Sequence, residues 1–103
     1  MHDLDAIQGV WHAETAAGRI VIPISPTLFG SKLLYKLDEN QRPKQIDLAH
    51  RRPRARPKSA AQGIYFLEGN TLRICWGYHG DRPSEFAADP ENQRHLLVLT
   101  RQP

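Results

Sequence analysis

The chain has 103 residues, with 14 Lys and Arg against 11 Asp and Glu, which gives a formal net charge of +3. This length corresponds to one domain, residues 1–103, and is enough to bury a core without cross-links. The single cysteine excludes an internal disulfide and fits no zinc framework. No apolar run approaches the roughly 20 residues of a membrane helix, so we expect no membrane insertion.

The positive charge is concentrated in one short segment, residues 50–58, which holds five basic residues and no acid. The rest of the chain has nine basic against eleven acidic residues, so the body of the domain is not a basic surface. The chain start lacks the basic-then-apolar pattern of a secretion signal. The lack of a secretion signal fits a cytoplasmic protein, or equally a domain excised from a longer one.

The first third of the chain predicts a helical turn and two strands. Leu4–Gln8 is expected to form the turn, with Leu4 and Ile7 closing one end of a core. Gly9–Thr15 is a plausible strand. Arg19–Ile24 is strongly β in type, but Pro23 lacks an N–H group and places that strand at an edge or bulge. The next residues, 25–27, read as a turn or loop.

The middle of the chain predicts a second pair of strands, Leu33–Leu37 and Lys44–Leu48, joined by a polar turn. Lys44–Leu48 alternates between polar and apolar residues, which is the pattern of a half-buried strand. One face of the two strands would carry five residues: Leu33, Tyr35, Leu37, Ile46 and Leu48.

Residues 63–76 predict a β-hairpin around Gly69-Asn70, because both residues tolerate the positive φ of a two-residue turn. In that register Leu67 faces Leu72 and Tyr65 faces Ile74. Trp76 continues this inner face, and Phe66, Arg73 and Cys75 lie on the other. A short strand at best is expected at Ser84–Ala87, and Arg94–Arg101 closes the chain as a strand.

The pattern of about eight short strands with turn signals between them indicates an all-β fold. Short connections between consecutive strands favour a small antiparallel up-and-down barrel. The stretch Arg19–Lys32 contains Pro23, Pro26 and Gly30, which interrupt a regular strand. One strand there is expected to be short or lost, which leaves full closure of the barrel open.

Three features together resemble a known family. Gly9-Val10-Trp11 after a helical turn is similar to the G-x-W signature of lipocalins, and Arg101 sits where lipocalins carry a basic residue over that tryptophan. Further segments resemble the small, lipocalin-like planctomycete uncharacterised domain family: residues 35–38, 43–48, 63–65, 69–75, 82–86 and 97–101. The resemblance covers most of residues 4–101. It implies a bacterial protein with a lipocalin-like barrel and, by analogy with lipocalins proper, a binding role without catalysis.

The inner face supplies the candidate ligand-binding residues, an apolar set with a few polar groups. They are Tyr35, Ile46, Tyr65, Ile74 and Trp76. The alternative is a filled core, because an eight-stranded barrel is near the limit at which side chains alone fill the interior. We therefore predict a binding domain for a small apolar ligand or a protein partner.

The basic segment carries the alternative function, binding of nucleic acid or another anionic surface. Its candidate residues are Arg51, Arg52, Arg54, Arg56 and Lys58. Residues 49–61 contain no aromatic side chain on which bases could stack, so nucleic acid is the less favoured partner. The competing interpretation is a solvated loop between two hairpins.

Catalysis, metal binding and cofactor binding are not expected. Cys75 and His79 are the cysteine–histidine pair closest in sequence, with Asp81 or Glu85 as a third group. An inert half-buried thiol and a surface histidine are the favoured interpretation. The other histidines are scattered and have no metal-ligand spacing.

Trp11 and Arg101 give the most specific structural expectation. In a closed barrel the first and last strands are neighbours, so the Arg101 guanidinium should lie on the Trp11 indole face. Its N–H groups should also reach carbonyl groups of the opening helical turn. Gly9 would be required because the chain passes close beneath the ring.

Overall fold

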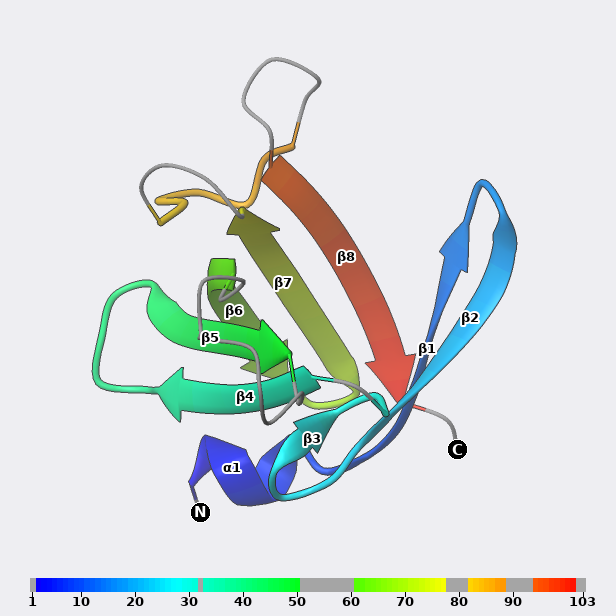
Figure 1. Ribbon diagram of the computed structural model, residues 1–103, viewed down its shortest axis with the longest axis horizontal. Helices are drawn as coiled ribbons and strands as arrows, with labels where there is room; N and C mark the ends of the chain where they lie inside the picture. Colours follow the sequence, from blue (N-terminus) through cyan, green and yellow to red (C-terminus); the bar gives the residue numbers. More distant parts are fainter. Residues whose placement is uncertain (1, 32, 51–60, 78–81, 89–93, 102–103) are drawn as a thin grey trace.

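The computed structural model describes residues 2–31, 33–50, 61–77, 82–88 and 94–101. These residues form one helical turn and eight strands (Figure 1). In chain order they are α1 (Asp3–Ala6), β1 (Gly9–Thr15), β2 (Gly18–Ile24), β3 (Leu28–Phe29), β4 (Leu33–Asp38), β5 (Lys44–His50), β6 (Ala61–Glu68), β7 (Thr71–Gly77) and β8 (Arg94–Arg101).

The strands form a closed antiparallel barrel in sequence order, from β1 to β8 and back to β1. Closure depends on two residue pairs between the first and last strands, Trp11 with Arg101 and His12 with Thr100. The predicted up-and-down barrel is therefore confirmed, and the question of closure is answered. In Figure 1 the β1–β2 hairpin leans away from β8 beyond these pairs, so the barrel is splayed at the end that carries the β1–β2 turn.

The strand count is right, but one strand is in a different place from the one predicted. Ser84–Ala87 forms no strand. The remaining strand is β3, only two residues long, which pairs Phe29 with Ile24 of β2 and with Leu33 of β4. The expectation of a short strand within Arg19–Lys32 is confirmed, and the barrel closes in spite of it.

The β6–β7 hairpin has the predicted register, with Leu67 opposite Leu72 and Tyr65 opposite Ile74. Gly69 has a φ of 57°, the left-handed conformation that the two-residue turn requires. Gly63 pairs with Trp76 at the far end of the hairpin. A Cβ atom on Gly63 would lie 2.7 Å from the Cys75 carbonyl oxygen, so only glycine lets the two strands approach this closely.

The core fills the interior of the barrel from inward-facing residues of most strands. Its fully buried members include Trp11, Ile46, Tyr65, Leu72, Ile74 and Leu99. Ile7, just after α1, is also fully buried and packs with this cluster. The end of the barrel at α1 is therefore filled, and we call it the closed end.

Part of the outer face is buried as well. Ile64 and Cys75 face each other across β6 and β7 on the outer side, and both are almost completely inaccessible. The Cys75 thiol lies 3.5 Å from the Ala87 carbonyl oxygen, which places the segment 82–88 against this part of the sheet. Arg82 fixes the segment, because it donates hydrogen bonds to the Ile46 and Gly63 carbonyls and pairs with Asp47.

Candidate functional site

The closed end is held together by Trp11 and Arg101, as predicted. The Arg101 guanidinium carbon lies 4.2 Å from the centroid of the Trp11 ring. Arg101 also donates hydrogen bonds to the carbonyls of Ala6 and Gln8, and the Trp11 indole N–H donates to the Ile7 carbonyl at 2.8 Å. These bonds satisfy carbonyl groups at the end of α1 and anchor it to the barrel.

Gly9 is required at this site, although the reason differs from the one predicted. Its φ is 138°, a conformation that residues with a Cβ atom rarely adopt. A Cβ atom there would lie 2.7 Å from a guanidinium nitrogen of Arg101. The close neighbour is therefore the arginine rather than the indole ring.

A second polar contact, which the sequence analysis missed, ties α1 to the strands. Asp3 accepts hydrogen bonds from the Lys44 ammonium at 2.8 Å and the Tyr65 hydroxyl at 2.7 Å. Burial favours the neutral acid, but these donors outweigh that effect and hold the pKa of Asp3 below its usual 3.8. No short-range pattern connects residues 41 and 62 positions apart, so only the fold reveals this cluster.

Tyr65 is thus a structural residue of the closed end. Burial and the hydrogen bond to Asp3 both raise its pKa, so the hydroxyl stays protonated and donates to the carboxylate. A tyrosine that faces the core needs such a partner for its hydroxyl.

The structure separates the five predicted ligand-binding residues into two groups. Ile46, Tyr65 and Ile74 are fully buried members of the core, so for these three residues the filled-core alternative describes the structure. Tyr35 is half-buried, donates a hydrogen bond to the Ser25 carbonyl at 2.6 Å, and its burial raises its pKa. Trp76 is half-buried at the opposite end of the barrel.

We call that opposite end, where β7 finishes and β8 starts, the open end. Trp76 stands across from His95, and their rings stack with centroids 5.3 Å apart. Leu97 follows on the same inner face and is half-buried. Ile20, inward-facing on the splayed β1–β2 hairpin, is also partly exposed. The inner face thus reaches solvent at this end, with an aromatic pair at its border.

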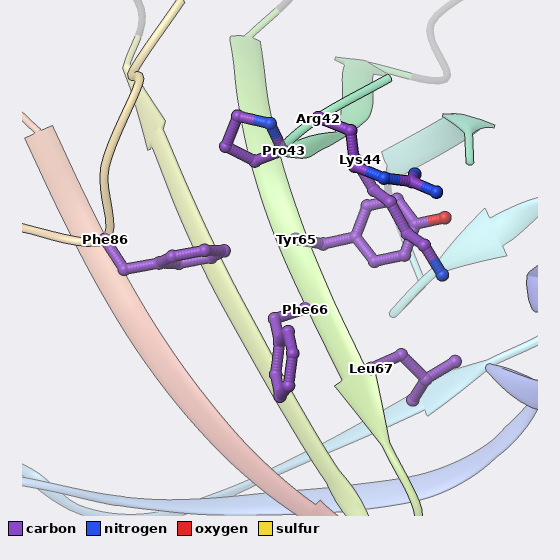
Figure 2. Close-up of a pocket in the computed structure, with 7 residues that line it drawn as sticks. All are labelled: Arg42, Pro43, Lys44, Tyr65, Phe66, Leu67 and Phe86. Atoms are coloured by element: carbon purple, nitrogen blue, oxygen red, sulfur yellow. The ribbon is translucent and has the colours of Figure 1, made fainter. Parts of the chain in front are cut away.

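A groove on the outer surface is the second candidate site (Figure 2). It has a volume of about 270 Å³ and lies beside β6. Its lining residues are Arg42, Pro43, Lys44, Tyr65, Phe66, Leu67 and Phe86. In Figure 2 the Phe66 and Phe86 rings stand on the same side of β6, and Phe86 comes from the segment that Arg82 fixes.

A third hollow, of about 380 Å³, lies between α1 and the β4–β5 connection. Three of its lining residues are acidic, Asp5, Asp38 and Glu39, but Glu39 is already engaged by His2 and by the Asp3 amide. Apart from Tyr65, neither this hollow nor the groove is lined by a buried residue of the core. The interior of the closed end is occupied by side chains.

The other predicted candidates have mixed outcomes. Arg51, Arg52, Arg54, Arg56 and Lys58, proposed for anion binding, lie outside the described residues, as do His79 and Asp81. Cys75 is fully buried rather than half-buried, because the segment 82–88 covers it. Over the described part of the chain, no three potential metal ligands cluster and no helix is long and apolar enough to cross a membrane.

Comparison of the chain with family models, with curated proteins and with solved structures gives no match. The resemblance to the planctomycete uncharacterised domain family therefore stays a prediction. The candidate sites stand on their own geometry.

Proposed function

We propose that this domain is a non-catalytic binding module that takes a small apolar ligand at the open end of the barrel. One observation carries the proposal: Ile20, Trp76 and Leu97 face inward at the open end and are partly exposed, whereas Ile7, Trp11 and Tyr65 at the closed end are fully buried. Exposure of an otherwise continuous apolar inner face is a property of small-molecule sites in barrel mouths.

The residues at the open end indicate which ligands fit. Trp76 and Leu97 offer apolar contact, and Ile20 faces inward from the β1–β2 hairpin. The His95 imidazole adds a polar group at the border of the site. This combination favours a compact ligand with an aromatic or aliphatic body.

The test uses N-phenyl-1-naphthylamine, a neutral apolar dye whose fluorescence increases in apolar surroundings. We expect saturable enhancement with the wild type and loss of that enhancement in Leu97→Glu, which places a carboxylate on the inner face. Leu96→Glu is the matched control, because Leu96 is the neighbouring residue on the outer face and is 41% exposed. It should bind the dye like the wild type.

Thermal unfolding of both variants checks that the fold is retained, and His95→Ala provides a second, milder perturbation of the same end. In the Trp11→Phe variant Trp76 is the one remaining tryptophan, and energy transfer from it should report dye at the open end. A wild type that does not enhance the dye, or equal losses in the Leu96 and Leu97 variants, would contradict the proposal.

A further inference from the structure

The outer face of β6, β7 and β8 carries an exposed apolar surface that the proposed ligand site does not use. Phe66, Arg73 and Val98 lie directly opposite one another across the three strands. Phe66 is 41% and Val98 49% exposed, and Leu96 on the next row is 41% exposed. Exposed apolar residues grouped on one face are typical of protein interaction sites, and here Arg73 lies between Phe66 and Val98.

The groove of Figure 2 adjoins this surface, because Phe66 belongs to both. We call the two together the outer docking surface: Arg42, Pro43, Phe66, Arg73, Phe86, Leu96 and Val98. The groove volume of about 270 Å³ is below the usual range for drug-sized ligands, roughly 300–1,000 Å³. It therefore suits one or two side chains of a larger partner better than a whole small molecule.

The charges on this surface indicate the chemistry of the partner. The Arg73 guanidinium lies 5.7 Å from the Phe66 ring centroid, and Arg42 donates to the backbone carbonyls of Glu39 and Gln41. Among the described residues, no carboxylate forms an ion pair with either arginine. The Arg73 guanidinium thus lies beside apolar side chains, whereas Figure 2 shows the Arg42 side chain on the Tyr65 side of β6, away from Phe66 and Phe86. Arginine is a preferred ligand for carboxylates.

We propose that the outer docking surface binds an acidic peptide segment of another protein, in which Asp or Glu stands next to a large apolar side chain. The apolar side chain would enter the groove between Phe66 and Phe86, and the carboxylate would pair with Arg73. A second copy of this chain fits poorly, because a two-fold contact centred here would bring two Arg73 residues together.

Nucleic acid is less suited to the same surface. One face of the Phe66 ring is already covered by Arg73, which competes with base stacking. Among the residues named for this surface, only Arg42 and Arg73 are basic, which is few for a groove that follows a phosphate backbone.

The experiment begins with selection of a random dodecapeptide phage library on the immobilised full chain. We expect the selected peptides to share an acidic residue beside Phe, Trp or Leu. A selected peptide, made synthetically, should perturb backbone amide resonances around Phe66, Arg73 and Val98 in NMR spectra. Replacing its acidic residue by the amide should weaken binding by about tenfold, the effect expected for loss of one charge-assisted hydrogen bond.

Arg73→Glu should weaken binding at least as much, and it should improve binding of the same peptide with Lys in place of the acid. Arg19→Glu is the matched control, an exposed strand arginine on β2 away from this surface, and should bind like the wild type. Leu97→Glu should leave peptide binding intact. Peptide binding therefore tests the outer docking surface independently of dye binding at the open end.

Five results would overturn the proposal. The first three are a selection without an acidic-apolar consensus, amide shifts that map elsewhere, and equal affinity of the acidic and amide peptides. The fourth is tighter, salt-sensitive binding of an oligothymidine at the same amides, which would assign the surface to nucleic acid. Protein-concentration-dependent shifts of these amides without peptide would assign it to self-association and also contradict the proposal.

Discussion

The two ends of the barrel are built from the same strands, with the same alternation of inward-facing and outward-facing side chains. They differ in what packs over the core. At the closed end, α1 covers the interior, and Ile7, Trp11 and Tyr65 have almost no exposed surface. At the open end, Trp76 and Leu97 occupy equivalent inward-facing positions but remain half-exposed. Figure 1 shows α1 at one end and the splayed β1–β2 hairpin at the other.

The difference shows that inward orientation and burial are separate properties. Alternation decides which side chains face the inside of a barrel. Burial depends on whether another segment packs over the end of the barrel. At the closed end this segment is α1, which is held by hydrogen bonds of Asp3 to Lys44 and Tyr65 and of Arg101 to the Gln8 carbonyl. The open end has no such helical turn over it among the described residues, which is why the proposed ligand site lies there.

The largest expected effect compares the two tryptophans. Trp11→Ala should lower the free energy of unfolding by about 3–5 kcal/mol, since it removes a fully buried ring from the core. Trp76→Ala should cost clearly less, about 1–2 kcal/mol, because the Trp76 ring is partly exposed and loses less buried surface. Urea unfolding followed by circular dichroism measures both. Equal losses would mean that the open end is as tightly packed as the closed end.

Arg101→Ala should have an intermediate effect, a loss of about 1–2 kcal/mol, because the cation–π contact and the bonds to the Ala6 and Gln8 carbonyls disappear together. In a double-mutant cycle with Trp11→Phe the losses should be non-additive, since the two side chains are in contact. Additive losses would indicate that Arg101 acts without the indole. Arg94→Ala, at the opposite end of β8, is not expected to couple with Trp11→Phe.

The smallest effect concerns pH. The pKa of Asp3 is lowered below 3.8 in the folded protein, so ionised Asp3 stabilises the fold at neutral pH. That contribution should be fully present above about pH 4 and be lost as the pH falls through the lowered pKa. The stability difference between wild type and Asp3→Asn should therefore be constant from about pH 7 to 5 and shrink towards about pH 2. If the stability difference between the wild type and Asp3→Asn did not change over this pH range, the charge of Asp3 would not contribute to holding α1 on the barrel.

The hairpin was accessible from the sequence because short-range patterns encode it. Gly69-Asn70 sets the turn, and the turn sets the pairing of Tyr65 with Ile74. The contact between Trp11 and Arg101 followed from a simple topological rule, that the first and last strands of a closed barrel are neighbours. The inward position of Leu97 was equally accessible, since it alternates with Leu99 on the last strand.

The misplaced strand shows where such patterns stop. Ser84–Ala87 has the local composition of a short strand, but the segment instead covers Cys75 from outside and contributes Phe86 to the groove. Leu28–Phe29 pairs with two neighbours although it is only two residues long and follows a proline-containing turn. Whether a short segment joins a sheet depends on the free strand edges beside it, and that is a property of the whole fold.

The sequence by itself determined seven of the eight strands, their order, most of the inner and outer faces, and the contact between Trp11 and Arg101. Each of these follows from local backbone preference and from side-chain alternation, which act over a few residues. Only the tertiary structure decided that Ile46, Tyr65 and Ile74 are core rather than ligand contacts, that Asp3 joins Lys44 and Tyr65, and that Phe66 borders a groove with Phe86. Those outcomes depend on which segments cover which surface, and residues far apart in the chain acquire such relations only when the barrel closes.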